Sequence, residues 1–155
     1  MASDREDPCP GARDTGLLHP IALVALAVLI VNDHLLKARY PGWVTGKLSD
    51  AAGLIVFPLL ASALVTAIVR RADPRRVLAG CVAAAASGFA LVKLWAPATH
   101  AFALALGALQ WPFAAITGGV TGGIAPVAVV RDPSDLLALP FAAIALRLPR
   151  ATRPR

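Results

Sequence analysis

Seven polar residues gather where the first long apolar stretch of the chain ends and the next one begins. They are Asn32, Asp33, His34, Lys37, Lys47, Ser49 and Asp50. Carboxylates, imidazoles and ammonium groups transfer protons, form ion pairs or bind polar ligands. An unpaired charge in apolar surroundings is unfavourable, so such groups either pair with one another or serve a function. We therefore expect a ligand site or an ion-pair cluster at this position.

The same residues do not complete a known catalytic or metal-binding motif. His34 and His100 lie at no established metal-ligand spacing such as HExxH. Ser49 would need an adjacent base to act as a nucleophile, and Lys47 or His34 would have to supply it. We therefore assign no catalytic residue and predict neither a metal nor a cofactor.

Composition indicates a membrane protein. The chain has 155 residues, of which 57% are hydrophobic and 15% charged, against roughly 45–50% and 25% in soluble domains. The net charge is +6, but the basic residues lie at the ends of apolar stretches rather than beside stacking aromatic residues, so no nucleic-acid partner is expected. Cys9 and Cys81 do not form a disulfide pattern.

The apolar stretches predict an all-α integral membrane protein with a single transmembrane domain, residues 17–148. A disordered acidic tail, 1–16, precedes it and a basic tail, 149–155, follows. The predicted spans are about 17–36, 51–69, 77–95 and 134–148, with an interfacial or re-entrant helix at about 97–116 and a glycine-rich connector at 117–125.

Charge distribution predicts the topology. Four arginines lie in residues 70–76 and four more follow Leu146, and the positive-inside rule places both groups in the cytoplasm. An even number of spans must then separate them, so 97–116 is not expected to cross. We predict four spans and two cytoplasmic termini, although Lys37, Arg39 and Lys47 would lie outside and oppose the rule.

An internal repeat relates the two halves of the chain. "LLKARYP" (35–41) aligns with "LVKLWAP" (91–97), and "KLSDAAGL" (47–54) aligns with "DPSDLLAL" (132–139). The repeat predicts two tandem hairpins with the same orientation.

The repeat also predicts where the charges lie. Lys37, Asp50, Lys93 and Asp135 would converge at the outer ends of the four helices and form ion pairs. Two alternatives stay open. Asp33 precedes Lys37 by four residues, which suits a pair within one helix, and Asp50 and Asp135 could instead cap helix N-termini.

Small residues suggest a helix-packing surface on the third span. Gly80, Ala84 and Gly88 share one face, which allows the backbone of a neighbouring helix to approach closely. That neighbour would be the second span, or a second copy in a homodimer. The expected partners are thus the lipid bilayer and a second copy or another membrane protein.

Four short motifs carry a resemblance to a known family. "NDHLLK", "TGKLSDAAGL", "LQWPF" and "DPSDLLALP" resemble an uncharacterised family of small polytopic bacterial membrane proteins, over about residues 19–148. The resemblance implies a multi-pass fold and no particular activity. The chain is more distantly similar to VanZ-like membrane proteins, but it lacks their lysine directly after Asp33 and their arginine after Gly42.

Together these patterns favour a non-enzymatic inner-membrane protein. Its outward-facing polar cluster would bind a partner protein, a lipid headgroup or a small polar ligand. One alternative is transport of protons or a small solute by a dimer. Another is a membrane-embedded lipid-modifying enzyme in which His34 and Asp50 act as acid and base.

Overall fold

The computed structural model describes residues 16–40, 42–69, 71–116 and 123–148, and its regular elements there are all helical. The predictions for residues 1–15, 117–122 and 149–155 fall outside this part.

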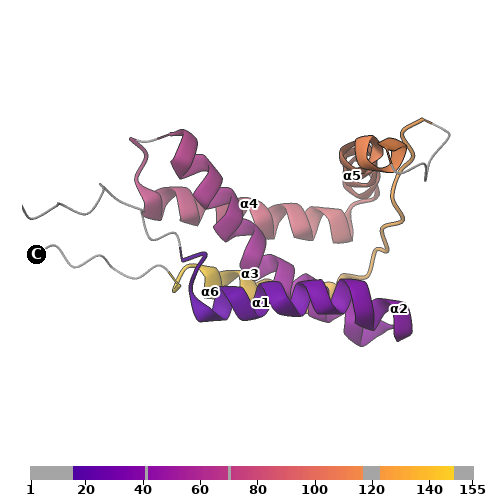
Figure 1. Ribbon diagram of the computed structural model, residues 1–155, viewed down its shortest axis with the longest axis horizontal. Coiled ribbons are helices and arrows are strands. Elements are labelled where there is room, and N and C mark those ends of the chain that lie inside the picture. The colour runs from indigo at the N-terminus through magenta and orange to yellow at the C-terminus, as the bar shows by residue number, and fades with distance from the viewer. Residues whose placement is uncertain (1–15, 41, 70, 117–122, 149–155) are drawn as a thin grey trace, which may run out of the picture. The chain divides into compact units, whose positions relative to one another are not determined.

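Two compact units are present, one ending at Ala85 and resuming at Ala138, the other comprising Ala86–Leu137. The helices are α1 (Pro20–Val31), the π-helical turn η1 (Asn32–Leu36), α2 (Lys37–Arg39), α3 (Trp43–Ile68), α4 (Pro74–Leu94), α5 (Ala96–Ile116), the 3₁₀ helix η2 (Pro133–Ala138) and α6 (Leu139–Ala145) (Figure 1).

The first long helix starts at a local cap and runs through three elements. Pro20 occupies its first position, and Nδ1 of His19 accepts the Ile21 backbone N–H at 3.3 Å. α1 continues through η1 into α2, so the helix covers Pro20–Arg39. It begins and ends three residues later than the predicted span 17–36.

The second long helix starts eight residues before the predicted span 51–69. Gly42 is the residue before α3, and its backbone N–H donates to Oγ1 of Thr45 at 3.1 Å. This bond satisfies one of the amide groups that a helix start leaves without a partner. Ser49 and Asp50 consequently lie inside α3 and not in a connector. The prediction that Asp50 caps this helix is wrong.

The third long helix starts three residues before the predicted span 77–95. Oδ1 of Asp73 accepts the Arg75 backbone N–H at 3.0 Å, and Pro74 is the first helical residue. After Leu94 the chain turns at Trp95 and continues as α5. Oγ1 of Thr99 lies 2.6 Å from the carbonyl oxygen of Val92 and 3.1 Å from that of Trp95, so this buried hydroxyl donates its one hydrogen to the backbone at the junction.

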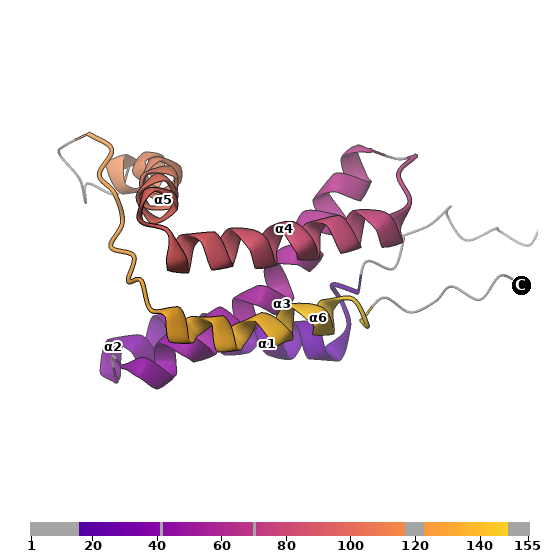
Figure 2. The ribbon, with the colours of Figure 1, turned by 180° about the vertical axis from the view of Figure 1, so that it is seen from behind.

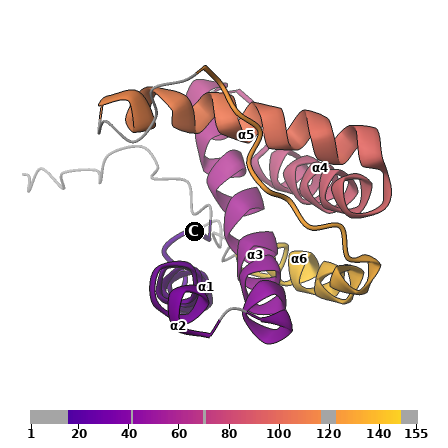
Figure 3. The same ribbon diagram turned by 90° about the vertical axis from the view of Figure 1, so that its right-hand side faces the viewer.

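In the first unit, α3 is the central helix. α1 packs on one side of it and α6 on the other (Figure 3). Leu54, Ile55 and Leu59 of α3 are buried, and Pro58 lies among them inside the helix. α3 therefore packs against α1, from the N-terminal part of the chain, and against α6, from its C-terminal part.

The structure contains three helices long and apolar enough to cross a membrane: Pro20–Arg39, Trp43–Ile68 and Pro74–Leu94. Their exposed surface is apolar, with Leu64 and Ile68 of α3 61% and 72% exposed. Such large apolar side chains are exposed all along the helices, which is unusual for a protein surrounded by water. The fold is thus compatible with a membrane protein.

The predicted fourth span is shorter in the structure than expected from residues 134–148. η2 and α6 together form a 13-residue helix, Pro133–Ala145. With a rise of about 2.0 Å per 3₁₀ residue and about 1.5 Å per α residue, it is about 22 Å long. A bilayer core is about 30 Å thick, so this helix alone does not match the full thickness.

In the second unit, an extended segment passes beside α5 and then leads to η2 (Figure 2). The Val127 backbone N–H donates to the carbonyl oxygen of Ala103 at 3.1 Å. Gly107 lies one turn further along α5, and a Cβ there would collide with the carbonyl oxygen of Ala125. Gly107 permits this approach because it has no side chain.

Substituting Gly107→Ala is therefore expected to destabilise the protein. The added methyl group has to displace the Ala125 backbone, which should lower the free energy of unfolding by about 1–3 kcal/mol. Denaturant titration in detergent micelles measures it. Gly46→Ala is the control, because a Cβ at Gly46 meets nothing within 4 Å in the described structure and improves helix propensity. Equal effects of the two substitutions would contradict the contact.

The small-residue face of α4 is exposed at Gly80, Ala84 and Gly88. Within the part of the chain that the structure describes, a Cβ added to Gly80 or Gly88 would meet no atom within 4 Å. The expected close contact with the second span is thus not made at Gly80, which lies in the same unit as α3. Packing against a second copy stays a prediction.

Candidate functional site

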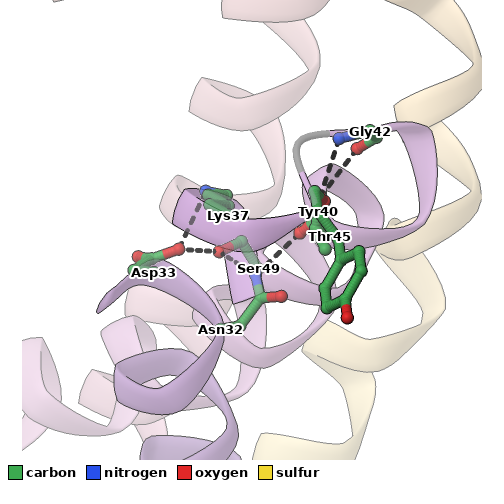
Figure 4. A network of polar contacts seen from close by, with 7 residues as sticks. All are labelled: Asn32, Asp33, Lys37, Tyr40, Gly42, Thr45 and Ser49. Carbon is green, nitrogen blue, oxygen red and sulfur yellow. Dashed lines mark hydrogen bonds and ion pairs between the residues drawn. The ribbon is translucent and has the colours of Figure 1, made fainter. Parts of the chain in front are cut away.

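A hydrogen-bonded network joins the first helix to α3 at the hairpin between them (Figure 4). Nδ2 of Asn32 donates to the carbonyl oxygen of Thr45 at 2.7 Å and to Oγ of Ser49 at 3.0 Å. The Ser49 hydroxyl in turn donates to Oδ1 of Asp33. Nζ of Lys37 lies 2.8 Å from the same Oδ1. The chain of contacts therefore runs without a break from the α3 backbone to the Lys37 ammonium.

Asn32 anchors the buried end of this network. It is 0% exposed, and Nδ2 faces a carbonyl oxygen, which can only accept. That contact fixes the orientation of the amide, since a flipped side chain would place two oxygens against each other. Oδ1 has no hydrogen-bond partner in the described structure. The donors of Asn32 are thus the part of the side chain that holds the hairpin together.

The π-helical turn places these residues against α3. At η1 the Lys37 backbone N–H donates to the carbonyl oxygen of Asn32, one residue further back than in an α-helix. A π turn is a local expansion of the helix, and such turns occur often at functional sites. Here it contains Asn32 and Asp33, the two side chains that reach Ser49.

Thr45 closes the turn between the helices. Its hydroxyl lies 2.9 Å from the carbonyl oxygen of Gly42 and 3.2 Å from that of Tyr40. It also accepts the Gly42 N–H, and its own carbonyl accepts from Asn32. The sequence interpretation missed Thr45. Its position one turn before Ser49 on α3 was the signal that could have found it.

The opposite end of the network is accessible. The side chains of Lys37 and Asp33 are 42% and 39% exposed, whereas Ser49 is buried. Of the two partners expected for Lys37, the structure selects Asp33, four residues earlier in the same helix. Because this ion pair is exposed, breaking it costs little free energy. The Lys37 ammonium can therefore leave the Asp33 carboxylate and bind an external anion instead.

Three further members of the predicted cluster lie at the same hairpin. Nζ of Lys47 lies 4.6 Å from the centroid of the Trp43 ring, within range of a cation–π contact. His34 is exposed, and none of the hydrogen bonds in the described network involves it. Asp50 is half-buried inside α3. The acid and base pair of His34 and Asp50 thus gains no support from this network.

The second unit holds its own ion pair. Nζ of Lys93, in the last turn of α4, lies 2.7 Å from Oδ2 of Asp135 and 3.4 Å from the carbonyl oxygen of Val130. The two side chains are only 13% and 11% exposed. Asp132 provides the cap of η2, since its Oδ1 accepts from the backbone N–H (2.9 Å) and hydroxyl (2.7 Å) of Ser134.

The predicted pairing is therefore realised in different ways in the two units. Lys93 pairs with Asp135, as the repeat suggests, whereas Lys37 pairs with Asp33. Convergence of Lys37, Asp50, Lys93 and Asp135 on one shared pocket stays a prediction. Across the described residues, no group of three or more histidine, cysteine, aspartate or glutamate side chains is arranged to hold a metal ion.

No family model, no curated protein and no solved structure matches the chain. The geometry of the two clusters is consequently the basis for a functional assignment.

Proposed function

We propose that the protein is a small multi-pass protein of the bacterial inner membrane, with four spans and both termini in the cytoplasm. The three long apolar helices support the coarse part of this proposal. The arginines of residues 70–76 and of the C-terminal tail support the orientation. η2 and α6 would supply the fourth span if the bilayer thins locally or the flanking residues extend it.

The proposed function is binding of a polar group at the hairpin formed by α1 and α3. That group would belong to a lipid headgroup, a partner protein or a small ligand. The exposed Asp33–Lys37 pair at the end of an otherwise buried network carries the proposal. The buried members hold Asp33 in place, and the Lys37 ammonium is presented outward with a carboxylate that an external group can replace.

Two variants that are compared for folded yield and for complementation test this proposal. Lys37→Gln removes the exposed ammonium but leaves the contacts of Asn32, Ser49 and Asp33 intact. We expect the variant to fold in normal yield, with an unfolding free energy within about 1 kcal/mol of the wild type, and to fail to complement a strain that lacks the gene. Ser49→Ala should instead lower folded yield, because it leaves an Asn32 donor without its acceptor.

The matched control is Arg71→Gln, an exposed cation that follows the other end of α3. It should fold and complement normally. Full complementation by Lys37→Gln, or loss of complementation only in proportion to lost folded protein, would contradict a binding role and leave the cluster a structural one.

A further inference from the structure

We infer that the polar group bound at this hairpin is the phosphate of an anionic phospholipid, held by a cationic collar of Lys37, Arg39 and Lys47 with the rings of Tyr40 and Trp43. This inference rests on the proposed function and specifies its ligand. It is drawn from the charge and the place in the fold of these five side chains, of which Lys47 is half-buried and the other four are exposed.

Charge at the collar favours an anion. Residues 33–50 carry the three cations Lys37, Arg39 and Lys47 against the two acids Asp33 and Asp50, a net charge of +1. The carboxylate of Asp33 already accepts from Ser49 and Lys37. Arg39 is exposed at the end of the first helix. The collar therefore presents excess positive charge to its surroundings, and the positive end of the α3 macrodipole adds to it.

The aromatic residues indicate the depth at which that anion lies. Tyr40 and Trp43 are 69% and 63% exposed, one on each side of the turn between the helices. Exposed tyrosine and tryptophan rings favour the headgroup layer, where an apolar ring face and a polar edge are both satisfied. The contact of Nζ of Lys47 with the Trp43 ring keeps a cation in the same layer. Phospholipid phosphate is the abundant anion at that depth.

The other end of α3 provides an internal comparison. Arg71, Arg75 and Arg76 are exposed there, but Asp73 lies among them and pairs with Arg76 at 3.5 Å. Residues 69–76 contain no aromatic side chain. Both ends of α3 thus carry arginine or lysine, and only the collar combines them with aromatic rings. Residues 70–76 hold four arginines against Asp73, a net charge of +3, so they supply a control with more positive charge and no aromatic ring.

Lipid retention in native mass spectrometry tests the inference. The purified protein is mixed in detergent with equal amounts of phosphatidylglycerol and phosphatidylcholine, and the bound ratio is measured. We expect wild type to prefer phosphatidylglycerol. A basic residue near an anionic lipid surface contributes about 1 kcal/mol, or about fivefold, so Arg39→Gln with Lys47→Gln should reduce the preference by more than tenfold. Arg71→Gln with Arg75→Gln should reduce it less, because residues 69–76 contain no aromatic ring that would hold the headgroup.

Three results would overturn the inference: no preference in wild type, equal losses in the collar and control variants, or displacement of the lipid by millimolar inorganic phosphate, which would mark a site for the free ion. A thermal melt of each variant shows that it is folded. Lys37 is left intact throughout, so a failure here does not alter the outcome of the Lys37→Gln complementation experiment, which tests the proposed function separately.

Discussion

Replacing Lys93 by methionine is expected to lower the free energy of unfolding by about 3–5 kcal/mol, because it leaves a mostly buried carboxylate without its ammonium partner. Asp135 is 11% exposed, and Nζ of Lys93 lies 2.7 Å from its Oδ2. The same ammonium contacts the carbonyl oxygen of Val130. The lost contacts join the end of α4 to the extended segment and to η2, 42 residues later. Denaturant titration in detergent micelles measures the change.

A double variant separates the pair from the individual residues. Removing both charges, with Lys93→Met and Asp135→Leu, should recover most of the stability that either single change loses, because neither buried charge of the pair is then left behind. Lys37→Gln is the exposed counterpart and should change stability by at most about 1 kcal/mol. If the double variant were as unstable as the sum of the two single variants, the pair would not be coupled as the structure indicates.

The second large effect is expected at Asn32. Asn32→Asp preserves the shape of the side chain but replaces the donating nitrogen with a carboxylate oxygen, directed at the Thr45 carbonyl oxygen and next to Asp33. We expect a loss of about 3 kcal/mol or more, since a fully buried charge would face another acceptor. Asn32→Ala removes the donors without adding repulsion and should lose about 1–3 kcal/mol. Both variants are measured in the same unfolding assay, and Asn32→Asp should have the lower free energy of unfolding. An aspartate tolerated better than alanine would show that donation by Nδ2 does not hold the hairpin.

Local chemistry explains which features of the fold were predictable. The start of α4 follows from Asp73 and Pro74, whose capping preferences act within one turn. The long apolar stretches likewise identify three helices that are long enough to cross a membrane. These signals need no knowledge of distant contacts, so the sequence alone reveals them.

Tertiary contacts explain the features that were missed. Lys47, Ser49 and Asp50 are typical of a loop, yet α3 starts at Trp43, because Ser49 finds partners in Asn32 and Asp33 across the hairpin. The π-helical turn has no local signal for the same reason. Density of polar residues did locate the site, but the choice of Asp33 over Asp50 as the partner of Lys37 depended on where η1 places the carboxylate.

The place of the hairpin at the membrane surface is the claim on which the function depends most. Labelling of single cysteines with a membrane-impermeant maleimide in intact cells measures it directly, in a background in which Cys9 and Cys81 are replaced by serine and alanine. Arg39→Cys at the collar should react from outside, and Arg71→Cys, beyond the other end of α3, should react only after the membrane is opened. Reaction of both positions from the same side would show that α3 does not cross the bilayer and would contradict the account.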